Sequence, residues 1–222
     1  LKNDPNYLAN LASLPEAQKN ALLYGDWDTF SGQVFTEWKN HPENEDRRNT
    51  HVIKPFPIPR HWRRYRSFDY GYSRPFAVQW WAVDEDGRAY LYRQLYGCTN
   101  TANTGLKMEP TAVAKAIREI EDSEEAGQTI IGIADPAIWD ESRGSAGTII
   151  NLFNEQGIYF EKGDNKRIPG KMQVHHRMAF DENGFPMMYV FDTCRDFIRT
   201  IPNLVYDEDK VEDIDTTGED HD

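Results

Sequence analysis

Residues 65–95 read YRSFDYGYSRPFAVQWWAVDEDGRAYLYRQL, and this stretch predicts three consecutive β-strands. Apolar and aromatic residues dominate three runs, at 65–69, 76–83 and 89–95. Turn-forming residues separate the runs, with Gly71 in the first gap and Asp84-Glu85-Asp86-Gly87 in the second. Because connections this short join strands that run in opposite directions, we expect an antiparallel meander.

After the meander the pattern changes to an alternation of helices and strands. Val113, Ala116, Ile117 and Ile120 recur at helical spacing behind Pro110 and predict a helix over 111–122. Residues 129–134 form a short continuous apolar run, typical of a strand buried on both faces. Further helices are expected at 148–155, 171–180 and 194–200, and further strands at 158–161, 187–191 and 204–206. This order predicts an α/β fold with a mixed sheet, a meander plus parallel strands, flanked by helices.

The first sixty residues differ from the rest of the chain. They are rich in Asn, Pro and charged residues, and only 15–24 has a clear helical pattern, which ends at Gly25. Prolines at 55, 57 and 59 favour a stiff, extended connector. We therefore expect residues 1–60 to be a lead-in or linker and residues 61–222 to form the domain.

The charge of the chain is strongly negative and unevenly distributed. Its 222 residues include 25 basic and 37 acidic ones, a net charge of −12, and residues 207–222 hold nine acids against Lys210, or −8. Nucleic-acid contacts therefore have to come from local basic clusters. No stretch approaches the roughly 18 apolar residues of a membrane span, and the two cysteines, Cys98 and Cys194, suggest thiols in a reducing compartment.

Two aspartates stand where predicted strands end. Asp69 closes the first strand before Tyr70-Gly71, and Asp135 closes the run 129–134 before Pro136. If the helix at 111–122 makes these strands parallel neighbours, both carboxylates emerge at the same end of the sheet. Taken alone, each aspartate is more often a turn former or helix cap.

A third candidate is Asp220, in the sequence Gly218-Glu219-Asp220-His221-Asp222. By itself it reads as part of a solvated acidic tail. Together, three carboxylates suit hard cations such as Mg²⁺ or Mn²⁺. Two such ions about 3.5–4 Å apart stabilise the attacking and leaving oxygens of a phosphodiester hydrolysis.

Two basic clusters are candidates for DNA binding. The first, 60–66, carries four arginines, of which we select Arg63, Arg64 and Arg66. Strand alternation would divide them between two faces, so pairing with the chain's own acids is an equally good interpretation. The second cluster follows the predicted strand at 158–161, in a loop that leads into a helix. Its members are Lys162, Lys166, Arg167, Lys171 and Arg177.

The sequence resembles the C-terminal nuclease domain of the large terminase subunit of tailed bacteriophages, a DNA-packaging motor protein. Four segments carry the resemblance: Leu22-Leu23-Tyr24-Gly25-Asp26-Trp27-Asp28 with Gly32-Gln33-Val34-Phe35, then Phe68-Asp69-Tyr70-Gly71, then Ala134-Asp135-Pro136, and the ending at 215–221. The first of these looks like the join that follows the ATPase domain in this family. The family's pattern usually continues past Asp-His into an apolar helix, whereas this chain stops at Asp222.

The resemblance implies an RNase H-like fold and a metal-dependent endonuclease that cuts concatemeric double-stranded DNA during packaging. Asp69, Asp135 and Asp220 would be the catalytic metal ligands for two Mg²⁺ or Mn²⁺ ions, with His221 as an alternative or supporting ligand. The implied partners are double-stranded DNA, the terminase ATPase domain, the small subunit and the portal or procapsid, in the host cytoplasm. No Gly-x-x-x-x-Gly-Lys-Ser/Thr motif is present, so we expect the chain to cut DNA but not to translocate it.

Two other interpretations remain open. The fold could be a docking module whose acidic tail binds a basic surface on capsid or portal, with idle carboxylates. It could also belong to another RNase H-like nuclease, such as a junction resolvase, although those proteins have no reason to carry the join at 22–35.

Overall fold

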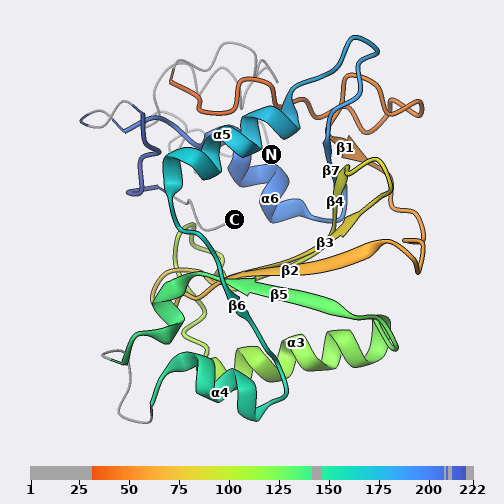
Figure 1. Cartoon of the computed structure of the whole chain (residues 1–222). Coiled ribbons are helices and arrows are strands. Elements are labelled where there is room, and N and C mark those ends of the chain that lie inside the picture. The colour runs from red at the N-terminus through yellow and green to blue at the C-terminus, as the bar shows by residue number, and fades with distance from the viewer. Residues whose placement is uncertain (1–31, 142–146, 208, 210–211, 219–222) are drawn as a thin grey trace.

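The centre of the molecule is a seven-stranded sheet with strand order β1-β7-β4-β3-β2-β5-β6. The computed structural model describes residues 32–141, 147–207, 209 and 212–218. Helices α3 and α4 cover one face of the sheet, and α5 and α6 lie on the other (Figure 1). The strands are β1 Val52–Ile53, β2 Arg63–Asp69, β3 Ala77–Val83, β4 Ala89–Tyr96, β5 Ile130–Ala134, β6 Glu161–Lys162 and β7 Met188–Phe191. The helices are α3 Pro110–Glu124, α4 Ile149–Glu155, α5 Arg167–Met178 and α6 Arg195–Thr200, with short 3₁₀ turns at Pro136–Trp139 and Ile201–Asn203.

The predicted meander is confirmed. Strands β2 and β3 pair antiparallel from Arg63 opposite Val83 to Asp69 opposite Ala77. Strands β3 and β4 pair in the same sense, with an irregularity between Trp80 and Trp81. Local sequence decides the topology of this region, because short turns place each of these strands beside the one before it.

The predicted parallel pairing is confirmed as well. Helix α3 starts with a proline at its first position and buries Val113, Ala114 and Ile117. It returns the chain to β5, which pairs parallel with β2. These features give the mixed α/β sheet, flanked by helices, that the sequence predicts.

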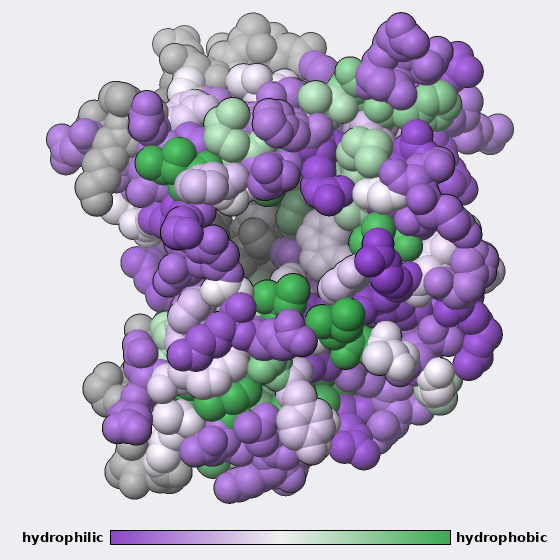
Figure 2. Space-filling model, viewed as in Figure 1, coloured by the Kyte–Doolittle hydropathy of each residue, from purple (hydrophilic) through white to green (hydrophobic). Residues whose placement is uncertain are grey.

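One expectation for β5 is wrong, because this strand is not buried on both faces. Ile131 and Ile133 are each 38% exposed. Only the two-residue β6 lies outside β5, and α5 and α6 lie over the other half of the sheet (Figure 1). Figure 2 shows hydrophobic surface in this region, beside a hollow between α5 and β5.

Three further boundaries differ from expectation. The strand predicted at 158–161 is only the two-residue β6, Glu161–Lys162. The predicted strand at 204–206 forms only isolated bridges, Val205 with Gln33 and Tyr206 with Ile214. Helix α5 begins at Arg167 rather than at residue 171. Pro169 is tolerated there because it lies in the first turn, where the backbone N–H groups have no partner within the helix.

The packed part of the chain begins before the predicted boundary at residue 60. Strand β1 pairs parallel with β7, and Val34, Phe35 and Trp38 are buried in the core. The segment before residue 60 therefore contributes a strand and core side chains, so it is more than a connector. The predicted helix at 15–24 lies outside the described residues.

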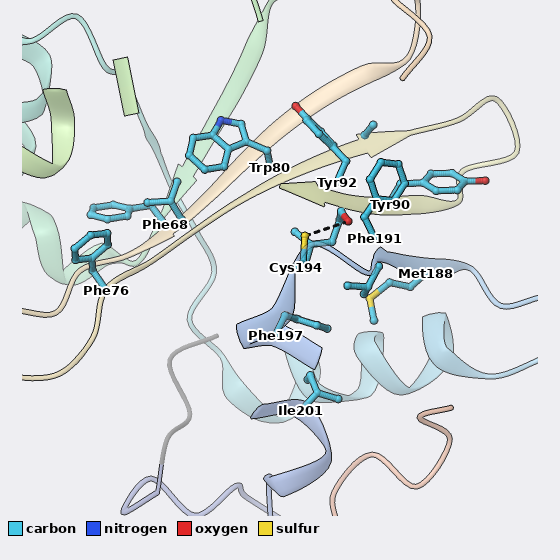
Figure 3. Close-up of a cluster of buried hydrophobic side chains, with 14 of the residues drawn as sticks. Phe68, Phe76, Trp80, Tyr90, Tyr92, Met188, Phe191, Cys194, Phe197 and Ile201 are labelled. Carbon is cyan, nitrogen blue, oxygen red and sulfur yellow. Dashed lines mark hydrogen bonds between the residues drawn. The ribbon is translucent and has the colours of Figure 1, made fainter. Parts of the chain in front are cut away.

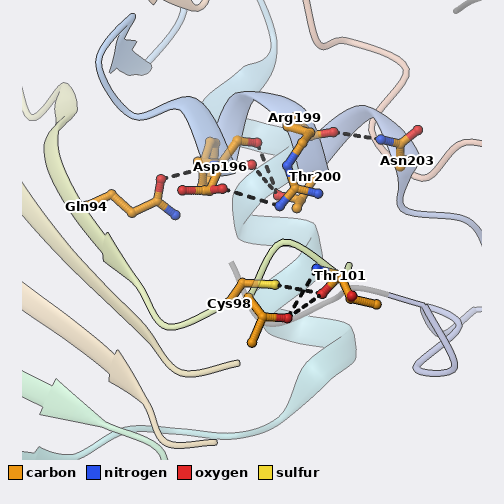
Figure 4. Close-up of polar contacts among 9 residues, drawn as sticks. Gln94, Cys98, Thr101, Asp196, Arg199, Thr200 and Asn203 are labelled. Carbon is orange, nitrogen blue, oxygen red and sulfur yellow. Dashed lines mark hydrogen bonds and ion pairs between the residues drawn. The ribbon is translucent and has the colours of Figure 1, made fainter. Parts of the chain in front are cut away.

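The core continues on both sides of the sheet. Figure 3 shows aromatic side chains of β2, β3 and β4 together with Phe191, Cys194 and Phe197. Cys194 donates from Sγ to the carbonyl of Leu91 at 3.6 Å, and no disulfide bond joins the two cysteines. Helix α6 is tied to β4 by the side chain of Gln94, whose Oε1 accepts from the backbone N of Phe197 at 3.0 Å (Figure 4). No helix among the described residues is long and apolar enough to cross a membrane.

Two buried ion pairs join β2 to α3 and to Glu125, the residue that follows α3. Arg64 pairs with Glu125, and Arg66 pairs with Glu121. The carboxylate of Glu121 also accepts from Trp80 Nε1 at 2.8 Å. The Arg66 guanidinium donates to the carbonyl of Tyr159 at 2.9 Å and lies over the ring of Phe160. A buried charge of this kind is tolerated only while its partner is present.

Removing one partner of such a pair should therefore be costly. We expect Glu121→Gln to lower the free energy of unfolding by about 3 kcal/mol, because Arg66 stays buried without a counter-charge. Urea denaturation at pH 7 measures the change. The control is Asp122→Asn, which breaks the exposed Arg118–Asp122 pair on the same helix and should cost less than about 0.5 kcal/mol. Equal effects of the two substitutions would contradict this account.

A buried histidine connects the segment before β1 to the end of α5. His51 is fully buried, and its Nδ1 accepts from the backbone N of Lys39 at 3.0 Å. Its Nε2 lies 2.8 Å from the carbonyl of Met178 and donates to it. The ring stacks on Trp38. Burial lowers the pKa of His51 below its usual 6.5, against smaller effects in the opposite direction from its hydrogen bonds and from Glu37.

This lowered pKa predicts a dependence of stability on pH. Below about pH 6.5 the unfolded chain binds a proton at residue 51 that the folded chain does not. Stability should therefore be full above pH 6.5 and fall as the pH drops toward the folded-state pKa, by at most about 1.4 kcal/mol per pH unit. Urea denaturation between pH 7.5 and 5.5 tests this. His51→Gln should flatten the profile, and His41→Gln, at an exposed histidine, should leave it unchanged.

Candidate active site at the carboxyl ends of β2 and β5

The register of β2 and β5 brings two aspartates together. Phe68 lies opposite Ala134, and the backbone N of Asp135 donates to the carbonyl of Phe68 at 3.1 Å, which extends the pairing by one residue. Asp69 is the last residue of β2, and Asp135 follows the last residue of β5. Both carboxylates therefore leave the sheet at the same end, as the sequence predicts.

The two aspartates line one pocket of about 320 Å³. The oxygen-bearing side chains around it belong to four chain segments. They are Ser67 and Asp69 of β2, Gln79 of β3, Asp135 after β5, and Asp164 and Asn165 after β6. This donor set consists of carboxylate, amide and hydroxyl groups, which are typical ligands of hard cations.

Asp135 has two roles in this arrangement. Its Oδ1 accepts from the backbone N of Ala137 at 2.7 Å and so caps the turn at Pro136–Trp139. The capping interpretation of Asp135 is therefore correct, yet it does not exclude the functional one. The cap fixes the side chain at the edge of the pocket, which is how a rigid site is built.

Tyr70 follows Asp69 and anchors the chain as it leaves β2. Its hydroxyl donates to the carbonyl of Met108 at 3.1 Å. Burial raises the pKa of Tyr70 to about 12, and the charge of Glu109 adds to the effect. Tyr70 therefore stays protonated at neutral pH and holds the residue next to Asp69 against the chain that leads into α3.

Asp164 is an acid in the pocket that the sequence analysis missed. It accepts from the backbone N of Lys166 at 3.1 Å, and its other oxygen lies 3.4 Å from the Lys166 ammonium. In the sequence, the basic residues of this loop are more conspicuous. The sequence feature that could have identified Asp164 is its place just after a short strand and Gly163. Because β6 pairs parallel with β5, the loop after Lys162 lies at the same edge as Asp135.

The third predicted carboxylate, Asp220, and its neighbour His221 lie outside the described residues. Among the residues that are described, no group of three or more His, Cys, Asp or Glu side chains is arranged to hold a metal ion. Gly218, which precedes Asp220 and His221 in the sequence, accepts at its carbonyl from Asn103 Nδ2 at 2.5 Å. Asp220 stays a prediction.

The first basic cluster divides between the two faces of β2. Arg64 and Arg66 are 7% and 3% exposed and are held by the glutamates of α3. The expectation that these two arginines contact DNA is wrong, because their guanidinium groups are buried in ion pairs. Arg63 is exposed and, by strand alternation, lies on the same face as Asp69.

The second basic cluster largely contacts the chain's own acids and carbonyls. Arg167 lies 3.3 Å from Asp213 and donates to the carbonyl of Ile214, and Lys171 donates to the carbonyl of Glu212. Lys166 pairs with Asp164, Arg177 donates to the carbonyl of Gly87, and Lys162 lies over the ring of Trp139. The structure thus brings Lys162, Lys166 and Arg167 close to the pocket through β6 and the start of α5, with their charge partly neutralised, whereas Arg177 lies by the β3–β4 turn at the other end of the sheet.

Solved structures of phage large terminases share this fold. The large terminase of a thermophilic bacteriophage, in complex with ADP, is 24% identical with a TM-score of 0.59, over 82% of this chain and 39% of that one. The complex of the same terminase with ATP-gamma-S gives a TM-score of 0.62 at 22% identity, over 86% of this chain and 42% of that one. The P22 large terminase nuclease domain is 18% identical with a TM-score of 0.59, over 84% of each chain.

These similarities define the class of fold. The chain has the RNase H-like mixed sheet of terminase nuclease domains, and the resemblance expected from the sequence is confirmed at the level of fold. It spans about two fifths of the thermophilic phage's terminase but most of the P22 nuclease domain. No protein-family model matches the chain, and no curated protein matches it in sequence.

Proposed function

We propose that the chain is the nuclease domain of a phage terminase large subunit and hydrolyses phosphodiester bonds of concatemeric double-stranded DNA during genome packaging. The single observation that carries the proposal is the pairing of β2 with β5, which places Asp69 and Asp135 in one pocket at the end of the sheet. The shared fold with the P22 nuclease domain supports the same conclusion.

The residues of the pocket fit a divalent cation. Asp69 and Asp135 would hold Mg²⁺ or Mn²⁺, and two ions are expected. When bound, such ions lower the pKa of a coordinated water and neutralise charge on the scissile phosphate. The chain's own contribution is to fix the two carboxylates on adjacent strands, with Asp135 locked by its bond to Ala137.

Asp220 is proposed as the third ligand, with His221 next to it. The proposal for these two residues rests on the resemblance of the ending at 215–221 to the terminase family.

The DNA would lie across the open end of the sheet. Of the basic residues predicted from the sequence, the proposal retains Lys162, Lys166, Arg167 and Lys171 as phosphate contacts beside the pocket. Arg63 and Arg177 are retained as contacts with more distant phosphates, because both lie toward the β3–β4 turn at the other end of the sheet. Several of these must exchange an internal partner for a phosphate, so binding should be weak and sensitive to salt.

The partners follow from the same proposal. The complexes of the thermophilic phage's terminase with ADP and ATP-gamma-S are of a longer chain. By analogy, an ATPase domain would precede residues 1–60 here and would drive translocation. The small terminase subunit and the portal or procapsid, in the host cytoplasm, complete the expected assembly.

Cleavage of supercoiled plasmid tests the proposal. We expect the chain to nick and linearise plasmid in Mn²⁺ or Mg²⁺ but not in EDTA. Asp135→Asn should reduce the rate at least about 100-fold, because it removes a ligand charge while the amide oxygen can still cap the turn. Gel densitometry over time measures both.

The matched control is Asp86→Asn. Asp86 is an exposed aspartate in the turn after β3, at the end of the sheet away from Asp69, and its loss should leave the rate unchanged. Cleavage by the Asp135→Asn protein at the rate of the control would refute the assignment of the site. A wild-type chain that is inert in every metal would favour the docking module.

A further inference from the structure

Two loops lie next to the pocket, at the end of the sheet where Asp69 emerges. Loop 70–76 joins β2 to β3, and loop 97–107 follows β4. The residues that flank the first loop, Asp69 and Ala77, are paired with each other and both line the pocket. Anything bound at the carboxylates therefore lies next to this pair of loops.

The two loops are locked together by backbone hydrogen bonds. The backbone N of Gly105 donates to the carbonyl of Ser73 at 2.9 Å, and that of Lys107 donates to the carbonyl of Tyr72 at 3.2 Å. The base is closed by the bond from the backbone N of Gly97 to the carbonyl of Phe76 at 2.8 Å. We call these two joined loops the loop platform.

Glycines make this close approach possible. A Cβ on Gly105 would lie 2.2 Å from the carbonyl oxygen of Arg74, and one on Gly97 would meet the ring of Phe76 at 2.1 Å. The second loop is also closed on itself, since Cys98 Sγ donates to the carbonyl of Thr101 at 3.5 Å (Figure 4). The loop platform is therefore tightly packed, as a surface that positions a ligand has to be.

The charge of the loop platform is opposite to that of the whole chain. Residues 70–76 and 97–107 contain Arg74 and Lys107 and no acid, while the chain carries −12. Both cations are exposed, and neither forms an ion pair with any residue in the described part of the chain. The nearest acid along the chain after Lys107 is Glu109, which precedes α3.

Each loop also carries an exposed apolar side chain near its cation in the sequence. Tyr72 is 43% exposed and Leu106 is 47% exposed. Cations bind phosphates, whereas tyrosine and leucine provide apolar contact area. The combination matches a sugar–phosphate backbone, in which charged phosphates alternate with sugars.

We propose that the loop platform binds the backbone of duplex DNA beside the bond that is cut, with Arg74 and Lys107 on phosphates and Tyr72 and Leu106 against the deoxyriboses. The inference rests on the proposed nuclease function and adds positioning residues to it. These two cations are available without breaking an internal ion pair, unlike Arg66 and Arg167.

The test is a double variant, Arg74→Gln with Lys107→Asn. Asparagine is chosen because Lys107 has a φ of 54°, a conformation that Asn tolerates better than most residues. Fluorescence anisotropy with a labelled duplex of about 30 base pairs in EDTA measures binding without cleavage. We expect the Kd to rise about tenfold. The slope of log K against log salt concentration should become shallower by about two, because each cation accounts for about one phosphate contact.

The matched control is Lys115→Gln. Lys115 is exposed to solvent on α3, the helix that covers the face of the sheet opposite to α5. Its substitution should change neither the Kd nor the slope. In Mn²⁺, the double variant should show a raised KM for plasmid with kcat little changed, at an unchanged Tm. If the wild-type chain binds and cuts but the double variant equals Lys115→Gln, the loop platform is refuted and the nuclease function stands. If the wild-type chain neither binds nor cuts, both proposals fail together.

Discussion

The parallel pairing of β2 with β5 is the constraint on which the rest of the structure depends. It requires a crossover long enough to bring the chain back, which α3 provides, and it fixes the register in which Phe68 faces Ala134. A shift by one residue would turn Asp69 or Asp135 to the opposite face. The positions of Asp69 and Asp135 therefore follow from the geometry of the sheet.

Strand β2 serves the fold with one face and the site with the other. Arg64, Arg66 and Phe68 point toward α3, where two glutamates neutralise the arginines. Arg63, Ser67 and Asp69 point toward the open side. Burying charged side chains costs free energy of desolvation, which the ion pairs offset. The pairs also orient α3 against β2. Because α3 returns the chain to β5, this orientation helps to make β5 parallel to β2.

The sequence was sufficient where local rules decide. Turn residues around Gly71 and Gly87 predict the meander, and an apolar run before Asp135 predicts β5. It was insufficient where distant segments decide. The burial of Arg66 depends on Glu121, which is 55 residues away, and the exposure of Ile131 depends on how far α5 and α6 extend over the sheet. The role of Asp164 depends on the pairing of a two-residue strand, which is too short to show a period of its own.

The distribution of charge explains why counting cations predicts DNA contacts poorly in this chain. The chain has 37 acids against 25 basic residues. In the part that the structure describes, many arginines and lysines contact acids or carbonyls of the chain itself, including most members of the two clusters that are conspicuous in the sequence. A cation is available to a phosphate where the backbone holds acids away from it. The loop platform meets this condition because its 18 residues contain no acid. Availability beside the carboxylates, rather than the number of positive residues, decides where an acidic nuclease can hold DNA.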